Sequence, residues 1–124
     1  MSAMWRLDHV QIAIPAGSEA ACRIFYVDVL GMMELQKPPE LAKRGGIWVR
    51  SGAVEIHLGV EAEFRPARKA HPGIVVADID ALAARLQAAG HTPAWDENIP
   101  GLRRFFTADP LGNRLEFIGN DDHG

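Results

Sequence analysis

Four side chains of this sequence have the types and the spacing of metal ligands. His9 and His71 lie 62 residues apart, and His57 and Glu116 lie 59 residues apart. The first two open alternating apolar segments, and the last two stand inside the segments that close the two halves of the chain. Three imidazoles and a carboxylate, without a thiolate, suit Fe, Mn, Ni, Co or Zn and leave coordination positions for water or substrate. The pattern predicts a divalent metal site at equivalent positions of two repeated units.

Each of these residues also has a simpler interpretation when it is taken alone. A single histidine near a strand end is more often a hydrogen-bonded core or surface residue than a ligand. Glu116, between Leu115 and Phe117, could face solvent on a half-exposed strand, since a buried carboxylate without a partner costs several kcal/mol. The repetition favours metal coordination for His9, His71 and Glu116, and whether His57 is a ligand stays open.

The elements that must position the ligands are predicted from hydrophobic periodicity. In the first half, residues 7–14 alternate as a strand does, and Ser18 can cap a helix that runs to Leu30. On that helix a buried stripe is expected, and its members are Ala21, Ile24, Phe25 and Val29. Three further strands are expected at 32–35, 47–49 and 54–60.

The second half repeats this order. Residues 72–76 are predicted to form a strand, and Asp78 can cap a helix that runs to Ala89 and ends at Gly90. Strands are expected at 92–95, 104–107 and 115–118. The sequence therefore predicts an α+β fold in which one domain (1–124) contains two βαβββ modules, at about 5–62 and 69–120. Their curved, barrel-like mixed sheet would carry its helices outside and would place first and last strands side by side.

Composition excludes several classes of protein. The 124 residues carry a formal charge of −3, which argues against a general nucleic-acid binder. No apolar run reaches the roughly 20 residues of a membrane span, and no signal peptide is evident, so the cytoplasm is the expected compartment. The single cysteine, Cys22, is expected to be a buried packing residue. His91 and His123 are expected to be exposed and receive no role.

Four stretches of the chain resemble the vicinal oxygen chelate superfamily: LDHVQIAIP, FYVDVLGM, HPGIVVADIDALAARLQAAG and DPLGNRLEFI. This superfamily includes glyoxalase I, fosfomycin-resistance thiol transferases, bleomycin-resistance proteins and extradiol dioxygenases. The resemblance implies that His9, His71 and Glu116 are metal ligands. The fourth ligand position, a glutamate in many glyoxalases, is His57 here, and this departure leaves the branch of the family undecided.

The resemblance also implies a chemistry and further site residues. The ion would act as a Lewis acid on adjacent oxygens of a small substrate, and Glu116 would move a proton as the catalytic group. Gln11 resembles a substrate-contacting position of the thiol transferases. Arg104 could hold a substrate carboxylate or phosphonate, or could be a surface arginine. Phe106 could form an apolar wall of the site. Trp48 and Trp95 could do the same, although core packing is the more common use of tryptophan.

Several functions remain open at this point. A glyoxalase-like lyase or isomerase is the leading hypothesis, with a ring-cleaving dioxygenase, a thiol transferase, a non-catalytic small-molecule-binding resistance protein and a structural repeat module as alternatives. The expected partners are a small molecule that can carry negative charge and a second copy of the chain, with no nucleic acid and no membrane. The site could lie within one chain or be shared across the homodimer.

Overall fold

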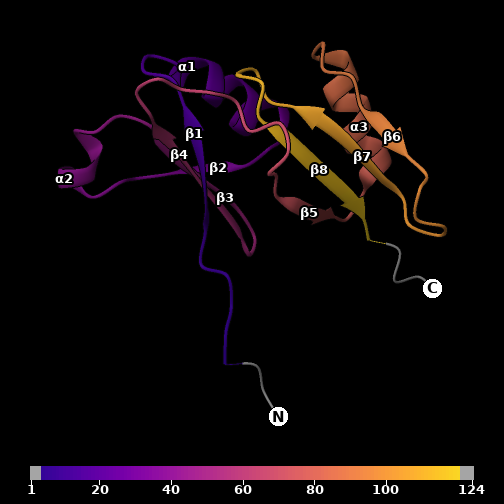
Figure 1. Cartoon of the computed structure of the whole chain (residues 1–124). Helices are drawn as coiled ribbons and strands as arrows, with labels where there is room; N and C mark the ends of the chain where they lie inside the picture. The colour runs from indigo at the N-terminus through magenta and orange to yellow at the C-terminus, as the bar shows by residue number, and fades with distance from the viewer. Residues whose placement is uncertain (1–3, 121–124) are drawn as a thin grey trace.

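Two four-stranded sheets form the framework of the protein in a computed structural model that describes residues 4–120 (Figure 1). The first sheet has the order β1 (Val10–Ile14), β4 (Val54–Val60), β3 (Ile47–Ser51) and β2 (Met33–Leu35). The second repeats it with β5 (Gly73–Val76), β8 (Arg114–Gly119), β7 (Arg104–Ala108) and β6 (Ala94–Asp96). The predicted α+β fold is confirmed, and the two sheets remain open.

The first and last strands of each unit are neighbours, as the sequence predicts. β1 pairs with β4 in parallel, with Gln11 opposite His57. β5 pairs with β8 in parallel, with Gly73 opposite Glu116. The remaining pairs in both sheets are antiparallel. Side chains alternate between the two faces of a strand, and residues paired across two strands lie on the same face. Gln11 therefore shares a face with His57, and Gly73 shares a face with Glu116.

The helix of the first unit differs from the prediction. It begins as α1 (Glu19–Cys22) and continues as the π-helical segment η1 (Arg23–Val29), in which the Leu30 N–H donates to the Phe25 carbonyl at 2.9 Å. The wider turn changes which residues share a face. Phe25 is buried as expected, but the burial predicted for Ile24 is wrong, since this side chain is 61% exposed.

Other boundaries shift by a few residues. β1 begins at Val10 rather than Leu7, so His9 lies immediately before the strand. β6 covers Ala94–Asp96 rather than 92–95. The helix of the second unit, α3 (Ile79–Ala88), begins after Asp78, whose side chain accepts a hydrogen bond from the Ala81 N–H as a cap does. A short helix that was not predicted, α2 (Pro39–Ala42), lies in the loop between β2 and β3.

One face of each sheet supplies the core. Its buried apolar residues form a single cluster with those of the helices: Ile12, Ile14, Ile47, Val49, Ile56 and Leu58 from the first sheet, Phe105, Leu115 and Phe117 from the second, and Cys22, Phe25, Tyr26, Ile79, Leu82 and Leu86 from the helical segments. The opposite face of each sheet is therefore left for polar side chains, among them His57 and Glu116.

The turn sequence DPLGN of the second unit forms hydrogen bonds with the first unit. Asp109 accepts a 2.6 Å hydrogen bond from the Tyr26 hydroxyl and further ones from the backbone of Leu111 and Asn113. Asn113 donates to the Ala13 carbonyl at 2.9 Å. Gly112 adopts φ +95, and a Cβ there would also approach Pro66. These hydrogen bonds connect the second module to the first, and we call the turn the DPLGN clasp.

Two other sequence expectations concern Cys22 and the histidines without a role. Cys22 is fully buried, as predicted, and burial raises the pKa of its thiol to about 11. His91 is half-buried rather than exposed, with its ring edge-on to Phe25 at 4.8 Å between centroids. His123 lies outside the described residues. Among residues 4–120, no helix has the length and apolar character needed to cross a bilayer.

Candidate metal centre

The first half-site is a stack of three rings on the polar face of the first sheet. Trp48 lies opposite His57 in the β3–β4 register, and their rings are parallel, with centroids 3.9 Å apart. His9 covers the other face of His57 at 4.0 Å. His57 is only 7% exposed, so the two neighbouring rings enclose it. Core packing is the more common use of a tryptophan, but Trp48 stacks its ring on His57, a candidate ligand.

Each histidine of this half-site is held by a nearby carboxylate. His57 Nε2–H donates to Glu55 at 2.7 Å, and His9 Nδ1–H donates to Asp8 at 2.9 Å. The hydrogen bond from His57 lowers the pKa of Glu55, and the one from His9 lowers the pKa of Asp8. With these donors assigned, His9 keeps Nε2 open for a ligand, whereas the Nε2 of His57 is already engaged.

The second half-site is a chain of charged groups. His71 Nε2 lies 3.0 Å from Oε1 of Glu116, and Arg104 Nη1 donates to Oε2 of Glu116 at 2.9 Å. Arg104 Nη2 donates to Asp96 at 3.1 Å. The Glu116 side chain is 10% exposed and the Arg104 side chain 17%. The hydrogen bond to Glu116 is the main cause that raises the pKa of Arg104.

The proton positions around His71 bear on metal binding. Its Nδ1–H donates to the Lys69 carbonyl at 2.8 Å, so a neutral ring directs the Nε2 lone pair at Glu116. A lone pair and a carboxylate oxygen cannot approach to 3.0 Å without a positive species that both can bind, which is either a proton or a metal ion. Nitrogen and oxygen donors held in this way fit a divalent transition metal.

The three predicted substrate-binding residues have different surroundings. Phe106 lies opposite Glu116 in the β7–β8 register, and its ring meets the edge of His71 at 5.5 Å between centroids. Gln11 is exposed, and its amide occupies the space that a Cβ at Gly59 would fill. Arg104 holds two protein carboxylates, so its two terminal nitrogens are already bound.

The four predicted ligands therefore form two pairs. His9 and His57 are in contact, and so are His71 and Glu116, but no group of three or more His, Cys, Asp or Glu side chains within residues 4–120 has metal-binding geometry. One chain in this conformation does not bring the pairs together. The predicted ligand set stays a prediction, and it needs both half-sites at one place.

Sequence reasoning did not identify several residues of the two half-sites. Glu55 shares a strand face with His57, and this parity could have identified it as the carboxylate partner. Asp96 has no local sequence signal, because it reaches Arg104 only through the β6–β7 pairing. Arg114 lies two residues before Glu116 on the same face, and its guanidinium covers the Phe106 ring at 4.1 Å.

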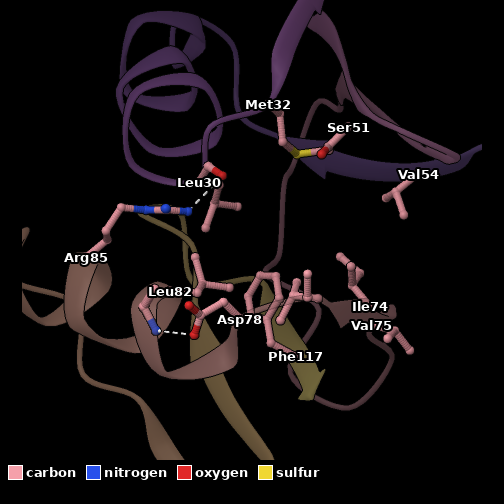
Figure 2. Close-up of a pocket in the computed structure, with 13 residues that line it drawn as sticks. Leu30, Met32, Ser51, Val54, Ile74, Val75, Asp78, Leu82, Arg85 and Phe117 are labelled. Atoms are coloured by element: carbon pink, nitrogen blue, oxygen red, sulfur yellow. Dashed lines mark hydrogen bonds between the residues drawn. The ribbon is translucent and has the colours of Figure 1, made fainter. Parts of the chain in front are cut away.

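Three of the open cavities among the described residues bear on the candidate site. One of about 630 Å³ is lined by His9, Trp48 and His57, and one of about 490 Å³ by Gln11 and His71. The third, of about 300 Å³, lies between the modules and is shown in Figure 2. Its walls are mostly apolar, its Arg85 donates to the Leu30 carbonyl, and none of the predicted site residues lines it.

Comparison with known proteins agrees with this architecture. Residues 6–117 match the family model of the Glyoxalase/Bleomycin resistance protein/Dioxygenase superfamily. A crystal structure described as a glyoxalase family protein from Bacillus anthracis is 44% identical, with TM-score 0.91, and the match covers 97% of this chain and 98% of that one. No curated protein matches the chain.

More distant structures share the fold. TnmS3, an antibiotic binding protein from Streptomyces sp. CB03234, is 22% identical with TM-score 0.71 over 96% of this chain and 98% of that one. Lactoylglutathione lyase from Agrobacterium tumefaciens is 20% identical with TM-score 0.66 over 90% and 92%. The chain belongs to the Glyoxalase/Bleomycin resistance protein/Dioxygenase superfamily, which is the vicinal oxygen chelate superfamily.

Proposed function

We propose that this protein is a metal-dependent enzyme of the glyoxalase type that acts on a small substrate with adjacent oxygen atoms. The observation that carries the proposal is the 3.0 Å contact between His71 Nε2 and Glu116 Oε1, a nitrogen and a carboxylate oxygen that can share a proton or bind one cation. His9, with Nε2 open, would supply a third ligand. The ion would be Fe, Mn, Ni, Co or Zn.

The ion, when bound, would supply Lewis-acid stabilisation of negative charge on the substrate oxygens. The residues around it have separate tasks. Arg104 holds Oε2 of Glu116 and so leaves Oε1 as the oxygen that faces His71 and the substrate. Glu116 would detach from the ion to accept a proton at Oε1 and would return the proton later, beside the Phe106 ring that contacts His71. His57 would become a ligand only after its Nε2 leaves Glu55.

A complete site would draw on two copies of the chain. Each copy carries the two half-sites apart, and β1 and β5, which lead from His9 and His71, are edge strands of their sheets. Met4, Trp5 and Leu7, just before His9, are 88%, 86% and 75% exposed. A homodimer that covers this apolar arm would bring the first half-site of one copy to the second half-site of the other.

The second candidate function is non-catalytic binding of a small molecule. The ring stack of Trp48, His57 and His9 beside a cavity of about 630 Å³ favours it, because such a surface suits a flat ligand without a metal. TnmS3, which shares the fold, is an antibiotic binding protein. A ring-cleaving dioxygenase and a thiol transferase are further branches of the proposed enzyme class.

Metal content separates these functions. Protein purified without chelator would be loaded in turn with Ni, Mn, Fe, Co or Zn, and its bound metal measured by plasma mass spectrometry. We expect one ion per site in the wild type and its loss in His71→Ala and Glu116→Ala. Glu40→Ala, a change at an 87% exposed glutamate of α2, is the matched control and should keep the metal. Wild-type protein that binds none of these ions would favour the binding protein.

The reaction is then identified with the metal-loaded protein. Glutathione hemithioacetals, catechols and fosfomycin represent the lyase, dioxygenase and thiol transferase branches. Turnover of a hemithioacetal that disappears in Glu116→Ala is the result expected here. Turnover of a catechol or of fosfomycin instead would assign the chain to another branch, and sedimentation analysis of the same samples would test the dimer.

A further inference from the structure

Two arginines lie over one aromatic ring, Phe106, on the polar face of the second sheet. Arg104 on β7 and Arg114 on β8 lie with their guanidinium carbons 5.2 and 4.1 Å from the centroid of Phe106. Phe106 also contacts His71. Both arginines are thus held next to the second half-site, each by a cation–π contact.

The two guanidinium groups differ in their partners. Arg104 donates to Asp96 and Glu116, and these carboxylates offset its charge. Arg114 takes part in none of the ion pairs or side-chain hydrogen bonds found between residues 4 and 120, and its contact is with the face of Phe106. A cation–π contact uses none of the N–H donors of a guanidinium as hydrogen bonds, so these donors can bind a carboxylate or phosphonate in a fork.

The cavity beside Arg114 has more cationic than anionic side chains in its lining. The cavity of about 490 Å³ is lined by Arg114 and by Arg65 from the linker, together with Gln11 and His71. Glu61 is the one carboxylate among its lining residues. Gln11 and His71 are predicted site residues from different modules, so the cavity connects a predicted substrate contact with a predicted metal ligand.

We propose that Arg114 is the residue that binds an anionic group of the substrate, a carboxylate or a phosphonate, with Arg65 as a second cation at the same cavity. The inference rests on the proposed function, since it places the anion beside His71. It also assigns Arg104 a different task from the one predicted from sequence. Arg104 becomes a positioning residue for Glu116, and Arg114 takes the contact with the substrate.

The test uses small probes and full-length protein freed of metal with a chelator. Phenylphosphonate and benzoate represent the two anionic groups, and diethyl phenylphosphonate is a neutral relative of the first. Binding is measured by titration followed by NMR. We expect wild-type protein to bind one or both anions and not the neutral ester, and Arg114→Gln to weaken that binding about tenfold to a hundredfold. Arg65→Gln should have a smaller effect.

Two further variants make the result decisive. Arg68→Gln removes an exposed linker arginine that does not line the cavity, and it should bind as the wild type does. Arg114→Lys keeps the charge but loses the fork, so its affinity should fall between those of the wild type and Arg114→Gln, and it serves also if the glutamine variant fails to fold. Equal binding by wild type and both Arg114 variants would overturn the proposal. An equal loss in Arg68→Gln would overturn it too.

The measurement stands apart from the metal assay. If the protein takes up no metal but binds the anions in a way that depends on Arg114, the proposed enzyme is refuted and the proposed anion site stands. If metal binding depends on His71 and Glu116 but the Arg114 variants bind the probes as the wild type does, the proposed anion site is refuted and the proposed enzyme stands.

Discussion

In the first module His57 lies between two aromatic rings and donates to a carboxylate two residues before it, whereas in the second module Glu116, at the equivalent position, lies between a histidine and an arginine. The duplicated scaffold thus repeats positions without repeating their environments. Stacking holds His57, and charged hydrogen bonds hold Glu116. In the second half-site the Nδ1–H of His71 is used by the Lys69 carbonyl, so its Nε2 and Glu116 can share a proton or a cation.

A second difference lies beside each pair. In the first module Gln11 is opposite His57, and its amide lies over Gly59. In the second module Gly73 is opposite Glu116, and the Ile118 side chain reaches over it. The long side chain is Gln11 on β1 in the first module and Ile118 on β8 in the second. With this arrangement Glu116 contacts His71 in the second half-site, and the Gln11 amide lies at the edge of the first half-site.

The largest effect should come from the carboxylates that contact histidines in the two half-sites. Glu116→Gln should weaken binding of a divalent metal at least a hundredfold, because the neutral amide is a poor ligand and the Arg104 charge then stays beside the site. Glu55→Gln should weaken it tenfold or less, as expected for a partner of a ligand rather than a ligand. Competition titration with a chromophoric chelator measures both. A larger effect of Glu55→Gln would move the centre to the first half-site.

Both half-sites depend on the DPLGN clasp that joins the modules. Tyr26→Phe removes the buried hydrogen bond to Asp109 and should lower the free energy of unfolding by about 2 kcal/mol, typical of a bond to a charged group. Urea denaturation at pH 7 measures the change. A loss below about 0.5 kcal/mol would show that the clasp does not hold the modules together.

Tyr26→Phe should also change how the stability of the protein depends on pH. Burial, with the Asp109 carboxylate as the next cause, raises the pKa of Tyr26 well above its usual range. The unfolded chain therefore releases this proton first, near pH 10, so the stabilising effect is complete below that pH and is lost as the pH rises further. Wild-type stability should fall more steeply above pH 10 than that of Tyr26→Phe. Cys22, with a pKa of about 11, is present in both proteins and adds to the fall in each.

A smaller effect is expected at the ring stack of the first half-site. Trp48→Leu removes one stacked ring from His57 and should cost about 1 kcal/mol of stability, with metal affinity within about threefold of the wild type. Trp95→Leu, at a 43% exposed tryptophan on β6, is the matched control. If Trp48→Leu reduced metal affinity as much as Glu116→Gln does, His57 would have to be a ligand that the stack orients.

The sequence predicted the parts of this molecule that local periodicity encodes. Alternation located β4 and β8 closely, and the repeat predicted that first and last strands pair, which placed His57 and Glu116 on the polar faces. The π-helical turn that exposes Ile24 has no periodic signal, because its hydrogen bonds shift by one residue only once the segment packs.

The partners of the candidate ligands were harder to predict. Arg104 looked free in the sequence, since Asp96 is on a neighbouring strand and Glu116 is twelve residues away across a hairpin. Arg104 meets Asp96 and Glu116 only through the β6–β7 and β7–β8 pairings, and local periodicity does not show which polar side chains these pairings bring together. For the same reason Arg114, with its cation–π contact, could not be distinguished from an ordinary surface residue.

The smallest effects should come from the two glycines that distinguish the half-sites. In Gly59→Ala the new methyl group would meet the Gln11 amide, the flexible end of a side chain that can move away. In Gly73→Ala it would lie 3.4 Å from Oε1 of Glu116, an ordinary contact. Stability should change by less than about 1 kcal/mol in both, since alanine also restricts the unfolded chain. If Gln11 contacts substrate, Gly59→Ala should raise KM with kcat unchanged, whereas Gly73→Ala, beside the proposed proton-transfer oxygen, should lower kcat. The reverse pattern would assign substrate contact to the second half-site and proton transfer to the first.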